Sequence, residues 1–226
     1  MRMSKIAVIA GSSGLVGTEL LHRICAGSEF SLVKLLVRKP SGFMHAKVKE
    51  YLTDFDRLEQ VAPVITGDVF FSCLGSTRKK TPDKQRYFQI DHDYPLEMAR
   101  IASANGMQQF HLISAVGARA GAANFYLDMK GKTEQDIAAV PFASVHIYRP
   151  SFLDGARTER RPLEQIALAL FRRVSPLMIG PLRKYRSIPA ADVAKAMIRK
   201  SLQPAAGVHY YESDVIQQVA RAEALH

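Results

Sequence analysis

Short apolar runs alternate with longer amphipathic stretches along most of the chain. The short runs are rich in Val, Ile, Phe and Tyr and are bounded by Gly, Pro, Asp or Ser, which is typical of strands buried on both faces. The longer stretches repeat apolar residues at helical spacing, and most end near Gly or Pro. This alternation predicts an α/β fold in which crossover helices connect the strands of a parallel sheet. The predicted strands are Ile6–Ala10, Val33–Arg38, Val48–Leu52, Val69–Ser72, Gln109–Ser114, Ser144–Tyr148 and Val208–Tyr211, and the predicted helices are Leu15–Ala26, Pro95–Asn105, Asn124–Ala139, Leu163–Val174 and Ala190–Ser201.

The length and the composition favour a single domain. The chain has 226 residues, of which 47% are hydrophobic and 23% are charged, as in an ordinary globular domain. No internal repeat, low-complexity tract or Gly/Ser linker divides it. Only 76 residues follow Pro150, which is too few for an independent second domain. We therefore predict one domain over 1–226, in which 151–206 form a small cap on the substrate side.

The positive charge is unevenly distributed along the chain. The net charge is +10, and residues 157–200 contain eleven basic and three acidic residues, so +8 of it lies in that segment. Such an excess attracts anions, which include phosphorylated cofactors, acidic substrates, nucleic acid and anionic partner surfaces. Nucleic acid is the least favoured of these, because the sequence lacks basic residues interleaved with aromatic ones, a zinc finger and a helix-turn-helix signal.

Several other classes of protein are disfavoured by the sequence. The two cysteines, Cys25 and Cys73, are 48 residues apart, so neither a disulfide framework nor a cysteine zinc site is expected. The seven histidines show no HExxH spacing, and no metal is assigned. The apolar run near the N-terminus has five residues, too short for a signal peptide or a membrane span. We expect a cytoplasmic protein.

Three glycines, Gly11, Gly14 and Gly17, lie between the first predicted strand and the first predicted helix. Gly11 permits a tight turn, Gly14 lets a pyrophosphate approach the backbone, and Gly17 lets the helix pack closely on the strand. The N–H groups of the helix would then point at phosphate. The alternative is a glycine-rich turn without a ligand, since the GxxGxxG spacing differs from the usual GxGxxG. The place of the turn in the α/β pattern favours nucleotide binding.

Basic residues end the second predicted strand, where a domain that prefers NAD presents a carboxylate to the adenosine ribose. Arg38 could pair with a 2′-phosphate through its planar fork, with Lys39 beside it. This pattern favours NADP(H). The alternative is a pair of solvated basic residues at a strand end.

Ser114, Tyr126 and Lys130 form a candidate catalytic set. Tyr126 and Lys130 are four residues apart, which places them on one face of a predicted helix, and Ser114 ends a strand. An ammonium group near Tyr126 favours its phenolate and makes the residue usable as a general acid/base. Ser114 would hydrogen-bond the substrate carbonyl and stabilise charge on its oxygen. The alternative for Tyr126 and Lys130 is an exposed helix face.

Together these residues make the sequence resemble a short-chain dehydrogenase/reductase, and more narrowly the atypical Tat-interacting oxidoreductase-like branch. The narrower resemblance rests on the segments 71–78, 90–94 and 125–134. It implies a doubly wound, Rossmann-type fold with helices on both faces of a mostly parallel sheet, NADP(H) as cofactor, and, for this branch, roles in protein–protein regulation. The cofactor contacts that it implies are Gly11, Ser13, Gly14, Leu15, Val16, Gly17, Arg38, Lys39, Cys73, Leu74, Gly75, Lys130, Arg149 and Pro150.

Some residues depart from the family pattern or have two interpretations. Asp91 stands where many relatives have an Asn that helps to hold a proton-relay water, which changes the charge and hydrogen bonding of that relay. Cys73 is interpreted as a small core residue and not as a nucleophile. The Arg78-Lys79-Lys80 run binds a phosphate or an acidic substrate, or is a solvated loop. The predicted helix Leu163–Val174 covers the substrate cleft or a dimer partner, or touches an anionic membrane surface.

Two functions fit these observations. The first is an NADPH-dependent reductase of a small carbonyl compound, with Tyr126 as general acid/base. The second is an NADP(H)-binding regulatory protein with little turnover that recognises a protein partner. A homodimer is compatible with both.

Overall fold

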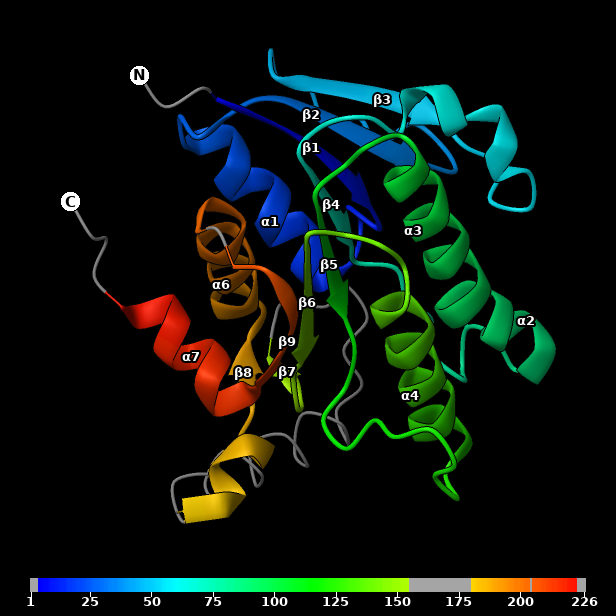
Figure 1. Ribbon diagram of the computed structural model, residues 1–226, viewed down its shortest axis with the longest axis vertical. Helices are drawn as coiled ribbons and strands as arrows, with labels where there is room; N and C mark the ends of the chain where they lie inside the picture. Colours follow the sequence, from blue (N-terminus) through cyan, green and yellow to red (C-terminus); the bar gives the residue numbers. More distant parts are fainter. Residues whose placement is uncertain (1–3, 155–179, 204, 223–226) are drawn as a thin grey trace.

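The protein is built on a seven-stranded parallel sheet, described here from a computed structural model that covers residues 4–154, 180–203 and 205–222. The strand order is β3-β2-β1-β4-β5-β6-β9, and every neighbouring pair is parallel (Figure 1). This arrangement confirms the predicted doubly wound α/β fold. The strands are β1 (Lys5–Ala10), β2 (Phe30–Val37), β3 (Val48–Leu52), β4 (Val69–Ser72), β5 (Gln109–Ile113), β6 (Ser144–Arg149) and β9 (Gly207–Glu212).

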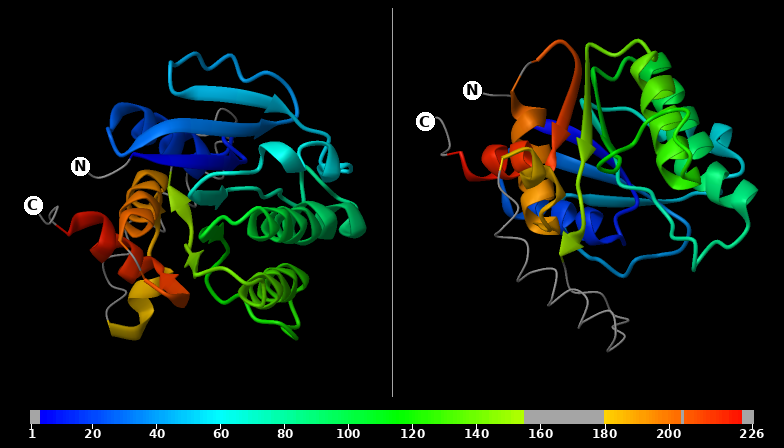
Figure 2. Two further views of the ribbon diagram at one scale, coloured as in Figure 1. Left: turned by 45° about the horizontal axis from the view of Figure 1, so that its top comes forward. Right: turned by 90° about the horizontal axis from the view of Figure 1, so that it is seen from below.

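Helices cover both faces of the sheet, and each face has its own apolar core (Figures 1 and 2). On one face lie α1 (Leu15–Ala26), α6 (Ala190–Leu202) and α7 (Ser213–Arg221). On the other lie α3 (Tyr94–Ala104) and α4 (Phe125–Ala138). The smaller elements are the helix α2 (Lys84–Phe88), the π-helix η3 (Gln89–Asp93), the 3-10 helices η1 (Leu58–Gln60), η2 (Ala62–Val64) and η5 (Gly180–Tyr185), and a two-stranded pair of β7 (Leu153–Asp154) and β8 (Ile188–Pro189).

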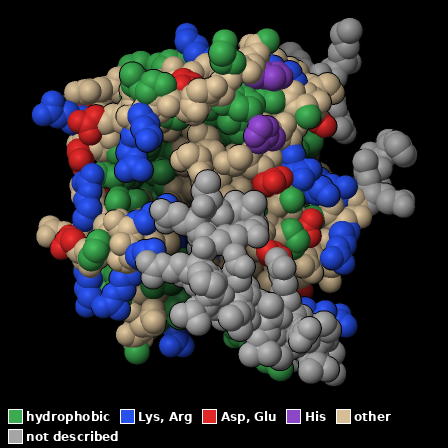
Figure 3. Space-filling view, turned by 180° about the vertical axis from the view of Figure 1, so that it is seen from behind, with side chains coloured by type: hydrophobic (Ala, Val, Ile, Leu, Met, Phe, Trp, Pro, Cys, Tyr) green, Lys and Arg blue, Asp and Glu red, His purple; other side chains and the backbone are tan. Residues whose placement is uncertain are grey.

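The predicted strands all form, with ends that shift by no more than three residues, and so do the predicted helices that fall in the described ranges. The helices α2 and α7 and the π-helix η3 are not among the predicted elements. The predicted helix Leu163–Val174 lies outside the described residues. The predicted cap of 151–206 includes α6, but α6 packs beside α1 in the core on one face of the sheet and is not part of a cap. Residues 155–179 of the predicted cap lie outside the described residues. Figure 3 shows one face of the molecule, on which Lys and Arg side chains lie toward both sides.

A buried histidine and tyrosine ladder crosses one face of the sheet. His111, His146 and His209 are paired in register on β5, β6 and β9, with ring centroids 4.5 and 5.2 Å apart. Nδ1 of His146 lies 2.8 Å from the Tyr211 hydroxyl, and Nδ1 of His111 lies 3.1 Å from that of Tyr148. Burial lowers the pKa of His146 to about 4 and that of His111 well below its usual value, so both rings are neutral near pH 7.

Candidate active site

The glycine turn lies where the strand order reverses, between the carboxyl ends of β1 and β4, which is where open α/β sheets bind ligands. Gly11 has φ +86°, and a Cβ there would lie 2.5 Å from the carbonyl carbon of Cys73. A Cβ on Gly17 would lie 2.1 Å from the carbonyl oxygen of Gly11. Both positions therefore require glycine, because the turn, the first helix and the end of β4 pack backbone against backbone.

The N-terminus of α1 is left open for an anion. Gly14 is its N-cap, no side chain caps the helix, and its first turn contains no acidic residue. Gly14 is exposed, as is Ser13, and Leu15 is half-buried. Val16 packs in the core, so its backbone alone can face a ligand. Uncapped N–H groups above a turn without side chains suit the pyrophosphate of a dinucleotide.

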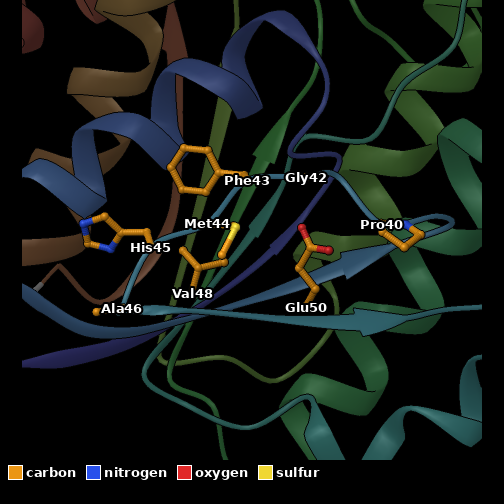
Figure 4. A pocket seen from close by; sticks show the side chains of 8 residues that line it. All are labelled: Pro40, Gly42, Phe43, Met44, His45, Ala46, Val48 and Glu50. Atoms are coloured by element: carbon orange, nitrogen blue, oxygen red, sulfur yellow. The ribbon is translucent and has the colours of Figure 1, made fainter.

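Arg38 and Lys39 follow β2 and are exposed. Neither forms an ion pair with any residue that the structure describes. The loop after them borders an open cavity of about 610 Å³, which Phe43 helps to line (Figure 4). The Phe43 ring packs edge-on against His22 of α1, with ring centroids 5.0 Å apart. Glu50 is the carboxylate of this cavity, and it already accepts a hydrogen bond from the backbone N–H of Ser41 at 3.2 Å.

Lys130 is buried in an ion pair with Asp91. Its Nζ lies 2.8 Å from Oδ1 of Asp91, whose Oδ2 accepts the backbone N–H of Ser76, also at 2.8 Å. Burial disfavours the ammonium, but the charge of Asp91 and the nearby phenols of Tyr126 and Tyr87 outweigh it and raise the pKa of Lys130 to about 12. Lys130 therefore keeps its proton, and Asp91 largely neutralises its charge.

Asp91 lies in the π-helix η3, between α2 and α3. Single π turns within helices occur often at functional sites, because they change the direction in which side chains point. The segment is tied to α4 at two places. Oγ1 of Thr133 donates to the carbonyl of Asp91 at 3.2 Å, and Nε2 of His92 lies 2.8 Å from Oδ2 of Asp136. These contacts fix Asp91 relative to the helix that carries Lys130.

Tyr126 lies in the first turn of α4, beside a second tyrosine that the sequence analysis did not identify. Oδ1 of Asn124 caps the helix by accepting the backbone N–H of Tyr126 at 2.9 Å. The rings of Tyr126 and Tyr87 have centroids 6.3 Å apart and planes 24° apart. Burial, followed by the charge of Asp91, raises the pKa of Tyr87 to about 12, so Tyr87 remains a phenol. The sequence gives no sign that Tyr87 lies beside Tyr126, because Tyr87 belongs to a short helix and to no recognisable motif.

Ser114 follows β5 and is 4% exposed. Its backbone N–H donates to the carbonyl of Tyr148 at 2.7 Å, while its Oγ has no hydrogen-bond partner among the described residues. A buried hydroxyl without a partner is costly unless a ligand satisfies it. The observation therefore fits a serine that donates to a substrate oxygen.

The loop between Ser114 and α4 is held tightly against that helix. A Cβ on Gly131 would lie 2.1 Å from the backbone nitrogen of Ala120, so glycine is required for this approach. The backbone N–H of Arg119 donates to the carbonyl of Leu127 at 3.0 Å. The loop is therefore positioned by α4 next to Tyr126.

Two further predicted cofactor residues, Arg149 and Pro150, lie at the carboxyl end of β6. The guanidinium of Arg149 is held by Glu134 at 2.5 Å and by Glu212 at 3.4 Å. The carbonyl of Pro150 accepts the N–H of Val116 at 3.0 Å.

The loop after β4 contributes Cys73, Leu74 and Gly75. Burial raises the pKa of the Cys73 thiol to about 12, so it stays protonated near pH 7, as the interpretation of Cys73 as a core residue requires. Leu74 packs against the apolar core, and Gly75 is exposed beside Asp91. In the described ranges no group of three or more His, Cys, Asp or Glu could hold a metal ion. No helix of those ranges is long and apolar enough to cross a membrane.

The doubly wound sheet, its glycine turn and the Tyr-x-x-x-Lys helix agree with the expected resemblance to the atypical short-chain dehydrogenase/reductases. Among curated proteins, the chain is 32% identical over 208 residues to Protein HTATIP2 of Rattus norvegicus, covering 90% of this chain and 84% of that protein. It is 30% identical over 224 residues to Protein FMP52, mitochondrial, of Debaryomyces hansenii, covering 97% and 96%. The chain belongs to the family of the HTATIP2 and FMP52 proteins. No protein-family model matches it.

Solved structures support the fold. A UDP-N-acetylglucosamine 4-epimerase from Methanobrevibacter ruminantium has a TM-score of 0.69 at 15% identity, covering 92% of this chain and 76% of that one. A short-chain dehydrogenase/reductase superfamily protein from Agrobacterium tumefaciens with bound NAD has a TM-score of 0.68 at 14% identity, covering 92% and 77%.

The expectation of a cytoplasmic protein is wrong in the light of these relatives. Fungal relatives from Debaryomyces hansenii, Aspergillus niger and Candida glabrata are all named mitochondrial. That expectation followed from the lack of a signal peptide and of a membrane span in the apolar run near the N-terminus. Neither absence bears on import into an organelle.

Proposed function

We propose that the protein is an NADPH-dependent reductase that transfers a hydride to a small carbonyl substrate. Its class is supported by the short-chain dehydrogenase/reductase fold and by relatives of the same family. The glycine turn, the open N-terminus of α1 and the exposed cations Arg38 and Lys39 would hold the cofactor. When bound, NADPH supplies the hydride.

The residues around Tyr126 have complementary roles in this reaction. The Ser114 hydroxyl donates a hydrogen bond to the carbonyl oxygen and stabilises its developing negative charge. As the carbonyl carbon gains the hydride, Tyr126 gives its proton to that oxygen, which yields the alcohol. The Lys130 ammonium, held by Asp91, lies near the phenolate that remains, and a proton from solvent restores the phenol. Atoms and charge then balance over the cycle.

The observation that supports this proposal is the buried Ser114 hydroxyl without a hydrogen-bond partner among the described residues, on a strand end whose following loop is hydrogen-bonded to the helix of Tyr126. The test is a panel of aldehydes and ketones assayed with NADPH. We expect Tyr126→Phe to lower kcat about 100-fold or more, the size of a lost general acid. Tyr87→Phe is the matched control, because it removes a neighbouring phenol oxygen and keeps its ring. Full turnover by Tyr126→Phe would remove Tyr126 from the chemistry.

The preference for NADPH depends on Arg38. Its guanidinium is exposed at the end of β2, where a carboxylate would repel the 2′-phosphate. Arg38→Ala should weaken NADPH binding about tenfold, the size of a lost charged hydrogen bond, and leave NADH binding nearly unchanged. Titrations of both cofactors measure this difference. Equal losses for both cofactors would contradict a contact with the 2′-phosphate.

A second candidate function is favoured by the ion pair of Lys130 with Asp91. Because Asp91 neutralises much of the ammonium charge, less of it acts on Tyr126 than if Lys130 were unpaired. A protein that binds NADP(H) and recognises a protein partner, with little turnover, fits this arrangement. It predicts tight NADPH binding, slow reduction of every carbonyl tested, and partner affinity that depends on the cofactor. Partner binding that is indifferent to NADPH would argue against it.

A further inference from the structure

A tight turn with three exposed cations is anchored directly to the Asp91–Lys130 pair. The carbonyl of Thr77 accepts the N–H groups of Lys80 and Thr81, both at 2.9 Å, and this closes the turn around Arg78, Lys79 and Lys80, here called the basic turn. Its start is fixed by Ser76, whose N–H donates to Oδ2 of Asp91 at 2.8 Å. The basic turn therefore begins two residues after a backbone contact to the carboxylate that holds Lys130.

A fourth exposed cation, Arg119, lies on the loop that is hydrogen-bonded to the helix of Tyr126. Arg119 is exposed on the loop after Ser114, and its backbone N–H donates to the carbonyl of Leu127, the residue that follows Tyr126. The close approach at Gly131 holds the same loop against α4. The basic turn and Arg119 are thus both attached by backbone hydrogen bonds to the residues around the candidate catalytic pair.

The basic turn and Arg119 make no ion pair with any described residue, while the nearby carboxylates are already engaged. Asp91 faces Lys130, and Asp128 pairs with Lys132 at 2.9 Å. Asp83 accepts the backbone N–H of Arg86 as the cap of α2. The buried centre is therefore close to neutral, while its exposed rim is cationic.

We propose that the basic turn and Arg119 bind an anionic group of the substrate, a carboxylate or a phosphate ester, and so orient its carbonyl toward Tyr126. This inference rests on the proposed reductase function. Lys and Arg side chains bind both anions through charge-assisted hydrogen bonds, and unpaired cations also raise the rate at which an anion enters a cleft.

Matched pairs of probes test the inference with the full-length protein and NADPH. The carboxylate probe is 4-formylbenzoate, and its neutral match is methyl 4-formylbenzoate. The phosphate probe is 4-formylphenyl phosphate, and its neutral match is 4-methoxybenzaldehyde. We expect kcat/KM for at least one anionic probe to exceed that for its neutral match about tenfold, which is the size of a charged hydrogen bond. The probe with the larger preference shows whether the site binds a carboxylate or a phosphate ester.

Charge reversals locate the effect. Lys79→Glu should abolish the preference for the anion and leave the neutral probe unchanged. Lys195→Glu is the control, because Lys195 is an exposed residue on α6 with the same change in charge. Calorimetric titration of each anion into the protein with bound NADP⁺ gives a second readout that needs no turnover.

The outcomes separate the two proposals. Equal reduction of anionic and neutral probes, with no effect of Lys79→Glu, overturns the inference and leaves the reductase function intact. If no probe is reduced, the reductase function fails for this class, and the titration decides the inference. The inference is supported if the anion binds saturably to the wild-type protein and to Lys195→Glu but not to Lys79→Glu. It is overturned if the anion does not bind to the wild-type protein, or if both variants lose binding equally.

Discussion

Acid should destabilise the fold through His146, which lies fully buried on β6 between two other histidines. Its imidazole is held by the hydroxyls of Ser144 and Tyr211 at 2.7 and 2.8 Å. Protonation would bury a positive charge near Lys200 and His209, which is why burial and these neighbours lower its pKa from 6.5 to about 4. In the unfolded chain the same ring takes up a proton freely.

The sign and size of the effect follow from linkage. Between about pH 6.5 and about pH 4, the unfolded chain binds a proton at His146 and the folded protein does not. The folded state therefore has the full stabilisation above pH 6.5 and loses it as the pH falls from 6.5 to about 4. The whole shift corresponds to about 3 kcal/mol, of which about 2 kcal/mol is lost between about pH 7.5 and about pH 5. His111, whose pKa burial also lowers, adds to the loss in the same direction.

Urea unfolding followed by circular dichroism at the two pH values measures this loss, because the chain has no tryptophan to report on it. His146→Gln keeps a polar side chain that cannot take up a proton. Its loss of stability on acidification should be smaller than that of the wild-type protein by about 2 kcal/mol. His45→Gln, at an exposed loop position, controls for the loss of any imidazole. If His146→Gln and the wild type lose equal stability, the reasoning about a buried neutral ring is refuted.

Two further predictions concern the packing around the site. Gly131→Ala should displace the loop that carries Arg119, because its Cβ would lie 2.1 Å from backbone atoms, and we expect a loss of stability with a fall in activity, measured by urea unfolding and by the NADPH assay. Asp91→Ala leaves the Lys130 ammonium buried without its partner and should cost about 3 to 5 kcal/mol in the same unfolding experiment. A cost below about 1 kcal/mol, as for an exposed pair, would mean that water reaches Lys130.

The fold could be predicted because its local signals agree with its tertiary structure. The helix α1 was predicted with its observed bounds, since it begins after the glycine turn and ends before Gly27. The central strands β1, β4 and β5 could be predicted because each is a short, largely buried apolar run. The outer strands β3 and β9 are only partly buried, and their Val and Tyr residues indicated them. The helix α7 was missed because it is short and mostly polar, and of its apolar side chains Ile216 and Ala220 are the ones that are buried.

The segment before α3 was missed for a different reason. The sequence predicts a helix that starts at Pro95, because the first turn of a helix is a common place for proline. In the structure α2 and η3 run into α3 without a break, although Pro95 has no N–H to offer to the preceding turn. The carbonyl of Asp91 lies four residues earlier, and the hydroxyl of Thr133 on α4 lies 3.2 Å from it while also lying 2.9 Å from the carbonyl of Met129. A tertiary contact thus lies where the helical hydrogen bond is missing, and no local pattern in the sequence indicates it.

Only part of the candidate site could be predicted from the sequence. The glycine turn and the spacing of Tyr126 and Lys130 are local patterns, and the sequence was sufficient to identify them. The position of Tyr87 beside Tyr126 and the ion pair of Lys130 with Asp91 join residues that are far apart in the chain. The resemblance to known families singled out Asp91, but it did not indicate that its carboxylate contacts Lys130.

The geometry around Asp91 explains why a carboxylate suits this position. Its two oxygens face two donors, the Lys130 ammonium and the backbone N–H of Ser76. An Asn side chain offers one acceptor and one donor group, so it would set its NH₂ against one of those donors. In Asp91, Oδ2 accepts the N–H of Ser76, and Oδ1 forms the ion pair with Lys130, so neither oxygen opposes a like group. Asp91 thus fixes Lys130 and the start of the basic turn at the same time, and the partial neutralisation of the Lys130 charge is the consequence of that double contact.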